Sequence, residues 1–249
     1  MESLAFSEEA RLVLEEFFQL KSGLLLLTGP AGSGKTTTIY AGLRHLAEHG
    51  GKHIITVEDP VEQIVKGVMQ TEINEARGLT FAKAARHLMR QDPEVLVIGE
   101  VRDDETAQIA VRAALTGHLV ISTLHAGTCQ GVLERLMLMC PDNYAVLSSL
   151  ALVANQRLVR RLCKSCEGKG CEDCLETGYK ERTPLLEWAA LDDEVRERIR
   201  KNGAAELKPT KSMREFAEVW VFREHVPGPG RGNCRGLVPG AQKRPHFVV

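Results

Sequence analysis

The fold of this chain is decided by the stretch Gly29-Pro30-Ala31-Gly32-Ser33-Gly34-Lys35-Thr36. It follows an apolar run over residues 24–27 and opens into a helix-compatible segment over residues 37–48. A glycine-rich loop between a strand and a helix is the context in which this motif binds phosphate. Its curled backbone directs N–H groups at the β-phosphate of a nucleotide, and the N-terminus of the helix adds to them.

Two side chains of this loop have predicted roles of their own. Lys35 places a compact cation against the β- and γ-phosphates, and Thr36 offers a hydroxyl to Mg²⁺. The predicted nucleotide contacts are Gly29, Pro30, Ala31, Gly32, Ser33, Gly34, Lys35, Thr36 and Thr37. The sequence therefore predicts a site for ATP with Mg²⁺.

The composition limits the class of protein. The chain has 249 residues, 43% hydrophobic and 26% charged, enough for one large core or for one domain plus a small appendage. A net charge of −1 and 5% aromatic residues give no indication of a nucleic-acid partner. We expect no signal peptide, and the longest apolar stretch, residues 145–154, is too short to span a bilayer. A soluble cytoplasmic chain is predicted.

Apolar runs alternate with helix-compatible segments along the chain. Strands are predicted over residues 24–27, 53–57, 69–73, 95–98, 119–123 and 185–188. Helices are predicted over residues 1–22, 37–48, 80–90, 105–115, 129–139, 143–161 and 192–200. In the first of these helices, Ser7 is the expected N-cap, and the expected apolar face holds Leu12, Val13, Phe17 and Leu20. This alternation indicates an α/β fold with a mostly parallel sheet covered on both faces.

Changes in composition suggest a division of the chain. We predict an ATPase core over residues 1–160, a cysteine-rich metal-binding loop over 161–182 and a C-terminal helical segment over 183–222. Residues 223–249 are rich in proline, glycine and basic residues and show no periodicity. We expect this tail to be disordered.

Carboxylates follow two of the predicted strands. Glu100 comes directly after Gly99 and the apolar run 95–98, where an acid of a phosphate-loop fold sits beside Mg²⁺. A solvated acid in a turn is the alternative. The strand over 53–57 leads into Glu58, which could polarise the attacking water, although Pro60 makes a simple turn equally plausible.

Three further residues are candidates for sensing the γ-phosphate. His125 follows the strand over 119–123, which ends at the same sheet edge as the glycine loop, and His118 precedes that strand. Arg86 and Arg90 lie four residues apart, so they share a helix face. They are either a solvated basic face or stabilise γ-phosphate charge, within one chain or across a subunit boundary.

The cysteines form two clamps. Without a secretory signal, the chain's seven cysteines are expected to be reduced thiols, which favours metal binding over disulfides. The four clustered residues are Cys163, Cys166, Cys171 and Cys174. Four thiolates close a tetrahedral Zn²⁺ site with no open position, so this site is predicted to be structural. Disulfides or unrelated thiols remain the alternative.

The motifs occur together in the order of a known family. They are the glycine loop, residues 56–62 (TVEDPVE), 90–93 (RQDP), 97–103 (VIGEVRD) and 116–125 (TGHLVISTLH). Together they resemble the hexameric ATPases of type II secretion and type IV pilus assembly. The resemblance covers roughly residues 5–215 by its motifs.

The resemblance implies a RecA-like core in a ring of identical subunits, a hexamer, that works with inner-membrane secretion or pilus platform components. It also implies an acidic box at Glu58, Asp59 and Glu62, with Glu58 activating water. A Walker B acid at Glu100 and a histidine box with His118 and His125 are implied as well. Arg86 and Arg90 match arginines that sense the γ-phosphate. The tetracysteine element favours assembly or secretion over retraction, and the protein would be peripheral to the inner membrane through its partners.

The sequence departs from the family at both ends. Family members carry a large domain before the phosphate loop, whereas about 22 residues precede the first strand here, so we expect the arginines of that domain to be missing. The tail after Val226 differs as well, either as a reading-frame artefact or as a divergent terminus. Alternatives to the motor are therefore a nucleotide-binding module with little turnover and a retraction motor. A small-molecule phosphotransferase is disfavoured, since we find no lid-like basic insertion.

Overall fold

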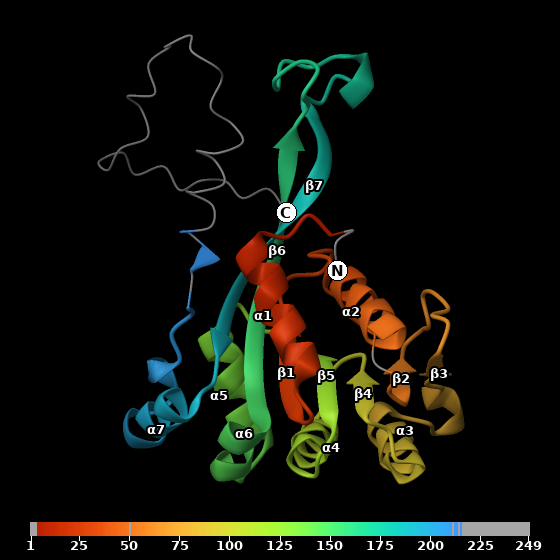
Figure 1. Cartoon of the computed structure of the whole chain (residues 1–249), viewed down its shortest axis with the longest axis vertical. Coiled ribbons are helices and arrows are strands. Elements are labelled where there is room, and N and C mark those ends of the chain that lie inside the picture. Colours follow the sequence, from red (N-terminus) through yellow and green to blue (C-terminus); the bar gives the residue numbers. More distant parts are fainter. Residues whose placement is uncertain (1–3, 50, 211, 214, 216–249) are drawn as a thin grey trace.

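The computed structural model describes residues 4–49, 51–210, 212–213 and 215. A seven-stranded sheet with the order β3-β2-β4-β5-β1-β6-β7 forms its centre (Figure 1). The strands are β1 (Gly23–Thr28), β2 (Ile54–Glu58), β3 (Val68–Glu72), β4 (Val95–Ile98), β5 (Leu119–Thr123), β6 (Leu150–Leu162) and β7 (Tyr179–Ala190). Neighbouring strands pair in parallel except β6 and β7, which are antiparallel. The predicted mostly parallel sheet is confirmed.

Helices cover both faces of this sheet. They are α1 (Glu8–Gln19), α2 (Lys35–His49), α3 (Phe81–Leu88), α4 (Asp104–Leu115), α5 (Cys129–Met139), α6 (Asn143–Ser149) and α7 (Asp193–Asn202). Leu25 and Leu27 of β1 pack with α1 and α2, whereas Leu24 and Leu26 pack against α3 to α7 on the opposite face. Every residue of β1 is therefore buried, as expected for a central parallel strand.

Helix α1 starts where the sequence predicts, but it turns a different face to the core. The Ser7 hydroxyl accepts a hydrogen bond from the Ala10 N–H at 3.2 Å, which confirms the predicted N-cap. The predicted apolar face is only partly correct, because Leu12 and Leu20 are 44% and 41% exposed. The buried residues are Ala10, Leu14, Phe17 and Phe18. They follow the i, i+4, i+7, i+8 spacing of one helix face.

The helix predicted over residues 143–161 is confirmed over residues 143–149 and wrong beyond them. Helix α6 ends at Ser149, and the next thirteen residues form β6. The first part of β6 pairs with β1, and nearly its whole length pairs with β7, which is correspondingly longer than the strand predicted over 185–188. A buried apolar run is ambiguous between helix and strand, and here two partner strands decide it.

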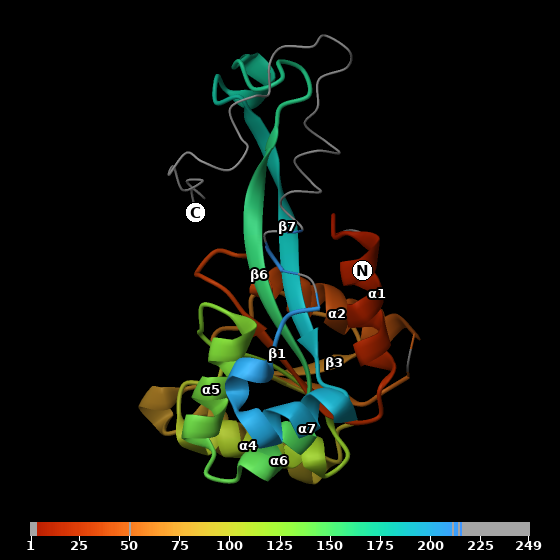
Figure 2. The ribbon, with the colours of Figure 1, turned by 90° about the vertical axis from the view of Figure 1, so that its left-hand side faces the viewer.

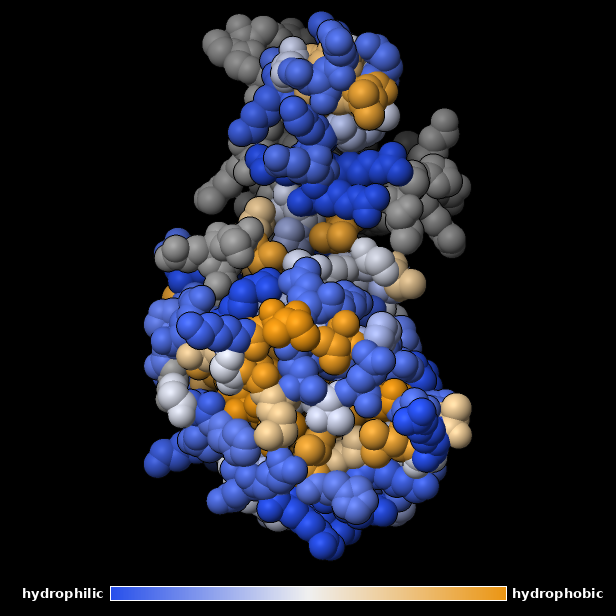
Figure 3. All heavy atoms as spheres, turned by 90° about the vertical axis from the view of Figure 1, so that its right-hand side faces the viewer, coloured by the Kyte–Doolittle hydropathy of each residue, from blue (hydrophilic) through white to orange (hydrophobic). Residues whose placement is uncertain are grey.

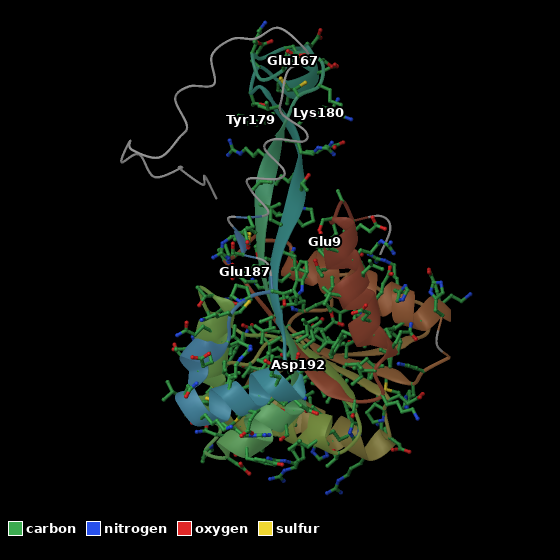
Figure 4. The ribbon with its side chains drawn as sticks, turned by 60° about the vertical axis from the view of Figure 1, so that its left-hand side comes forward. Glu9, Glu167, Tyr179, Lys180, Glu187 and Asp192 are labelled. Carbon is green, nitrogen blue, oxygen red and sulfur yellow. The ribbon has the colours of Figure 1, made fainter. Side chains whose placement is uncertain are left out.

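Beyond the core, β6 and β7 continue as a two-stranded projection (Figures 1 and 2). We call residues 158–184 the arm; its far end is the loop with the four clustered cysteines. Figure 4 shows Glu167, Tyr179 and Lys180 at this far end, and Glu187 at the base beside the core. Hydrophilic side chains dominate the arm in Figure 3, whereas apolar side chains are visible on the core below it.

Some predictions concern features that the described residues do not test. The division of the chain at residues 160, 182 and 222 stays a prediction, and its last segment, 223–249, lies outside the described residues. Within the described part of the chain, none of the helices has the length and apolar character needed to cross a bilayer.

Candidate nucleotide site and tetracysteine cluster

The glycine loop connects the end of β1 to the start of α2 and needs glycine at two positions. Gly29 has φ 144°, and a Cβ there would lie 2.3 Å from the Gln156 carbonyl oxygen. Gly34 has φ 86°, and its Cβ would lie 2.9 Å from the Gln156 side-chain nitrogen. Both conformations favour glycine, and β6 leaves no room for a side chain. The loop therefore curls tightly against β6.

The loop carries groups suited to phosphate. The Lys35 ammonium donates to the carbonyl oxygens of Gly29 and Pro30 at 3.0 and 2.9 Å. Burial and then the nearby charge of Arg157 lower the pKa of Lys35, while Glu100 opposes that shift. The Ser33 hydroxyl is buried and has no hydrogen-bond partner within the described residues. The Lys35 ammonium, the buried Ser33 hydroxyl and the N-terminus of α2 together form an environment that suits a bound phosphate group.

Thr36 and Thr37 are exposed in the first turn of α2. Their hydroxyls are therefore accessible at the mouth of the loop. This position agrees with the predicted contact between Thr36 and Mg²⁺, which stays a prediction.

Glu100 follows β4 and meets residues from two other strand ends. Its carboxylate lies 2.5 Å from Arg102 Nη2 and 3.6 Å from His125 Nε2. The same Arg102 nitrogen contacts Asp59 of the predicted acidic box at 3.0 Å. Hydrogen bonding to Glu100 is the main cause that raises the pKa of Arg102. The predicted site residues Asp59, Glu100 and His125 are thus gathered at one edge of the sheet around an arginine.

Glu58 is the last residue of β2 and is only 7% exposed. Its carboxylate accepts hydrogen bonds from the hydroxyls of Tyr40 and Thr56 and from the Gln70 amide. Three donors from α2, β2 and β3 thereby fix its position at the carboxyl edge of the sheet.

The two predicted histidines lie at opposite ends of β5. The loop of His125 is tied to the glycine-loop strand, since Thr28 Oγ1 donates to the Ala126 oxygen at 2.7 Å. His118 precedes β5, and its Nδ1 lies 3.0 Å from the Ala113 oxygen. The five-residue strand that lies between the two histidines is about 17 Å long. The structure therefore brings His125, but not His118, to the nucleotide edge.

Arg86 and Arg90 are not at the glycine loop of their own chain. They belong to α3 and the turn after it, and α3 covers the face of the sheet opposite to α2. Arg86 pairs with Glu105 at 2.6 Å, and both side chains are more than half exposed. Of the two predicted arrangements, the one across a subunit boundary is compatible with these positions.

Several residues at this carboxyl edge of the sheet had no role predicted from the sequence. Gln156 is 1% exposed, donates to the Ser33 carbonyl at 2.8 Å and accepts from Thr38 Oγ1 at 2.8 Å. Arg157 donates to the carbonyl oxygen of Gly127 at 3.3 Å. Gln156 and Arg157 interrupt the apolar run of β6, and this could have indicated a role for them, because buried polar side chains require hydrogen-bond partners. Tyr40 and Arg102 carried no comparable signal.

The four clustered cysteines meet at the tip of the arm. Their sulfur atoms all lie within 4.8 Å of one another, and three pairs are 3.7 to 3.8 Å apart. Four sulfurs bound tetrahedrally to Zn²⁺ at about 2.3 Å would be about 3.8 Å apart. The Cys174 sulfur also accepts from the N–H groups of Cys171 and Gly178 at 3.2 and 3.3 Å. The cluster is compatible with zinc, and the described residues contain only free cysteines.

Comparison with known proteins identifies the family. Residues 1–222 match the model of the type II/IV secretion system protein family. The chain is 41% identical over 236 residues to the type II secretion system protein HxcR of Pseudomonas aeruginosa, covering 89% of this chain and 50% of that protein. It is 39% identical over 265 residues to the type II secretion system protein E of Aeromonas hydrophila, covering 96% and 51%. The chain thus spans about half the length of the curated relatives it matches.

Solved structures agree on the fold. The pilus retraction motor PilT with bound ADP is 31% identical, with a TM-score of 0.68, and the match covers 90% of this chain and 60% of that one. The Legionella pneumophila ATPase DotB is 24% identical with a TM-score of 0.69, covering 87% and 60%, which supports the fold alone. These neighbours confirm the predicted RecA-like, P-loop type of α/β core. The chain therefore belongs to the type II/IV secretion system protein family.

Proposed function

We propose that this chain is a motor domain that binds and hydrolyses Mg²⁺-ATP and drives protein secretion or pilus assembly. One observation carries the proposal: the glycine loop with Lys35, the buried Glu58 and the Glu100 carboxylate occupy the same carboxyl edge of a parallel sheet. Ligands of α/β folds bind at this edge. The family relationship supports the same activity.

Each group has a chemical task in this proposal. Lys35 and the loop amides hold the β- and γ-phosphates, while Thr36 and Glu100 position the Mg²⁺ that enters with ATP. Glu58 orients the attacking water and accepts its proton as the new bond to phosphorus forms and the bond to the β–γ bridging oxygen breaks. His125 reports the presence of the γ-phosphate from its place beside Glu100.

Arg86 and Arg90 would complete the site of a neighbouring subunit. Both are exposed on a face away from their own glycine loop, which suits contact across a subunit boundary. Exposed apolar side chains at the edge of the sheet, Ile64 in the loop before β3 and Met69 within β3, also favour association of copies into a ring. The ring would act with inner-membrane platform components of the secretion or pilus machine on the cytoplasmic side.

Sequence identity and the cysteine cluster of the arm both favour a secretion or assembly motor over a retraction motor. Identity is higher to type II secretion proteins, at 41%, than to the retraction motor PilT, at 31%. The tetracysteine cluster points the same way, toward secretion or assembly. Zn²⁺ held there would be structural, because four thiolates leave no open coordination position.

Glutamine substitutions test the proposed roles of the two glutamates. Glu58→Gln and Glu100→Gln should each lower ATP hydrolysis by about 10²- to 10⁴-fold while leaving ADP binding measurable. Glu94→Gln is a matched control, because Glu94 is exposed at the opposite end of β4 and should keep wild-type turnover. Unchanged hydrolysis in both test variants would contradict this mechanism. ATP binding without turnover in the wild-type chain would instead favour the nucleotide-binding module.

A further inference from the structure

The carboxylate of Glu58 has one acceptor position left. A carboxylate offers about four lone-pair sites on its two oxygens. Thr56 Oγ1 and Gln70 Nε2 both donate to Oε1, at 2.5 and 3.0 Å, whereas Tyr40 donates to Oε2. Oε1 is therefore saturated. The remaining acceptor is on Oε2, the oxygen that Tyr40 holds.

The hydrogen-bond partners of Tyr40 fix the direction of its proton. The tyrosine is 3% exposed, and its hydroxyl oxygen accepts the N–H groups of Glu62 and Gln63 at 3.0 and 3.3 Å. With its acceptor positions occupied, the hydroxyl has Glu58 as the partner for its proton. Burial, and then the hydrogen bond to Glu58, raise the pKa of Tyr40, so it remains a donor at neutral pH.

Tyr40 also connects Glu58 to the nucleotide. It lies four residues after Thr36 on α2, one helical turn from the predicted Mg²⁺ contact. The same hydroxyl holds the backbone of the acidic box at Glu62. One oxygen atom thus joins the phosphate-binding helix, the acidic box and the carboxylate of Glu58.

We propose that Tyr40 is a positioning residue that aims the free acceptor of Glu58 Oε2 at the water that attacks ATP. This inference rests on the proposed function, because it requires Glu58 to act on that water. The hydroxyl of Tyr40 bonds to Glu58, Glu62 and Gln63, none of which belongs to the glycine loop, so removing it should affect turnover and not nucleotide affinity.

Tyr40→Phe tests the inference, because it keeps the buried ring and removes only the hydroxyl. We expect kcat for ATP hydrolysis to fall on the order of 10-fold, with KM and ADP affinity within about two-fold of wild type. Tyr144→Phe is the matched control, since Tyr144 is 68% exposed on α6 and should keep wild-type kcat. Thr56→Val should reduce kcat less than Tyr40→Phe, because Gln70 still holds Oε1.

A double mutant separates positioning from a structural effect. If Tyr40 acts through Glu58, adding Tyr40→Phe to Glu58→Gln should change the residual kcat by less than about two-fold. A purely structural effect would lower kcat by the same factor in both backgrounds, and that result would overturn the inference. Loss of ADP binding in Tyr40→Phe would overturn it as well, since Tyr40 would then support the glycine loop itself.

The remaining outcomes distinguish the inference from the proposed function. Wild-type hydrolysis in Tyr40→Phe, together with an inactive Glu58→Gln, would overturn the inference and leave the function intact. Wild-type hydrolysis in Glu58→Gln would contradict the proposed role of Glu58 and, with it, the role of Tyr40.

Discussion

The nucleotide edge and the arm are held together by different means. At the nucleotide edge, β1, β2, β4 and β5 are buried along their whole length between two layers of helices. In the arm, most residues are exposed or half-buried, and the buried ones are Cys163, Cys174, Gly178 and Thr183. The geometry of the nucleotide site therefore depends on the packed core, whereas the tip of the arm depends on its thiol cluster. The two regions should respond independently to perturbation.

The largest effect should come from removing the proposed Zn²⁺ from the tip of the arm. Chelation should release about one Zn²⁺ per chain and leave residues 163–178 open to protease, because the tip has little apolar burial to replace the metal. ADP affinity should stay within about two-fold of the untreated chain. Metal analysis, limited proteolysis and ADP titration measure these quantities.

Single cysteine substitutions give the control for this experiment. Cys166→Ser should abolish zinc binding, whereas Cys140→Ser, in a buried residue outside the cluster, should retain it. Loss of ADP binding on chelation would break the separation between the two regions.

A matched pair of leucines in β6 should give an intermediate effect. Leu152 is 2% exposed in the core, whereas Leu162 is half-buried at the end of the strand. Leu152→Ala should lower the free energy of unfolding of the core by about 2–5 kcal/mol, since it leaves a cavity. Leu162→Ala should leave the unfolding midpoint of the core nearly unchanged. Denaturant unfolding followed by α-helical circular dichroism compares the two; equal losses would mean that arm and core unfold as one unit.

The smallest effect should come from the exposed ion pair between α3 and α4. Glu105→Gln removes the partner of Arg86, but both side chains are more than half exposed. Such pairs contribute about 0–1 kcal/mol to stability. Thermal unfolding in low and high salt should therefore show little change; a large loss of stability would mean that Arg86 is needed within its own chain.

The same comparison explains what could be predicted from the sequence. The glycine loop, the strand over 95–98 before Glu100 and the helix cap at Ser7 are local signals, and the structure contains each of them. The cysteine spacing likewise predicted a cluster that the structure assembles. Local steric and hydrogen-bonding requirements decide these features, so a short stretch of sequence is enough.

The conformation of residues 150–162 required partners far away in the chain. An apolar run is compatible with a helix until β1 and β7 pair with it. The hydrogen bonds of Tyr40, Arg102 and Gln156 likewise join separate elements, so no local sequence pattern could predict them. The positions of His118 and His125 at opposite ends of β5, by contrast, follow from the strand predicted over residues 119–123.

Steady-state ATP hydrolysis by the purified chain across a protein concentration series, beside Lys35→Ala, tests the proposed motor activity most directly. A ring motor should show turnover per chain that rises cooperatively with protein concentration, because arginines from one subunit complete the site of another, and this turnover should disappear in the variant. Hydrolysis that persists in Lys35→Ala, or its absence at every concentration in a wild-type chain that binds ADP, would contradict the assignment of this chain as an ATP-hydrolysing ring motor.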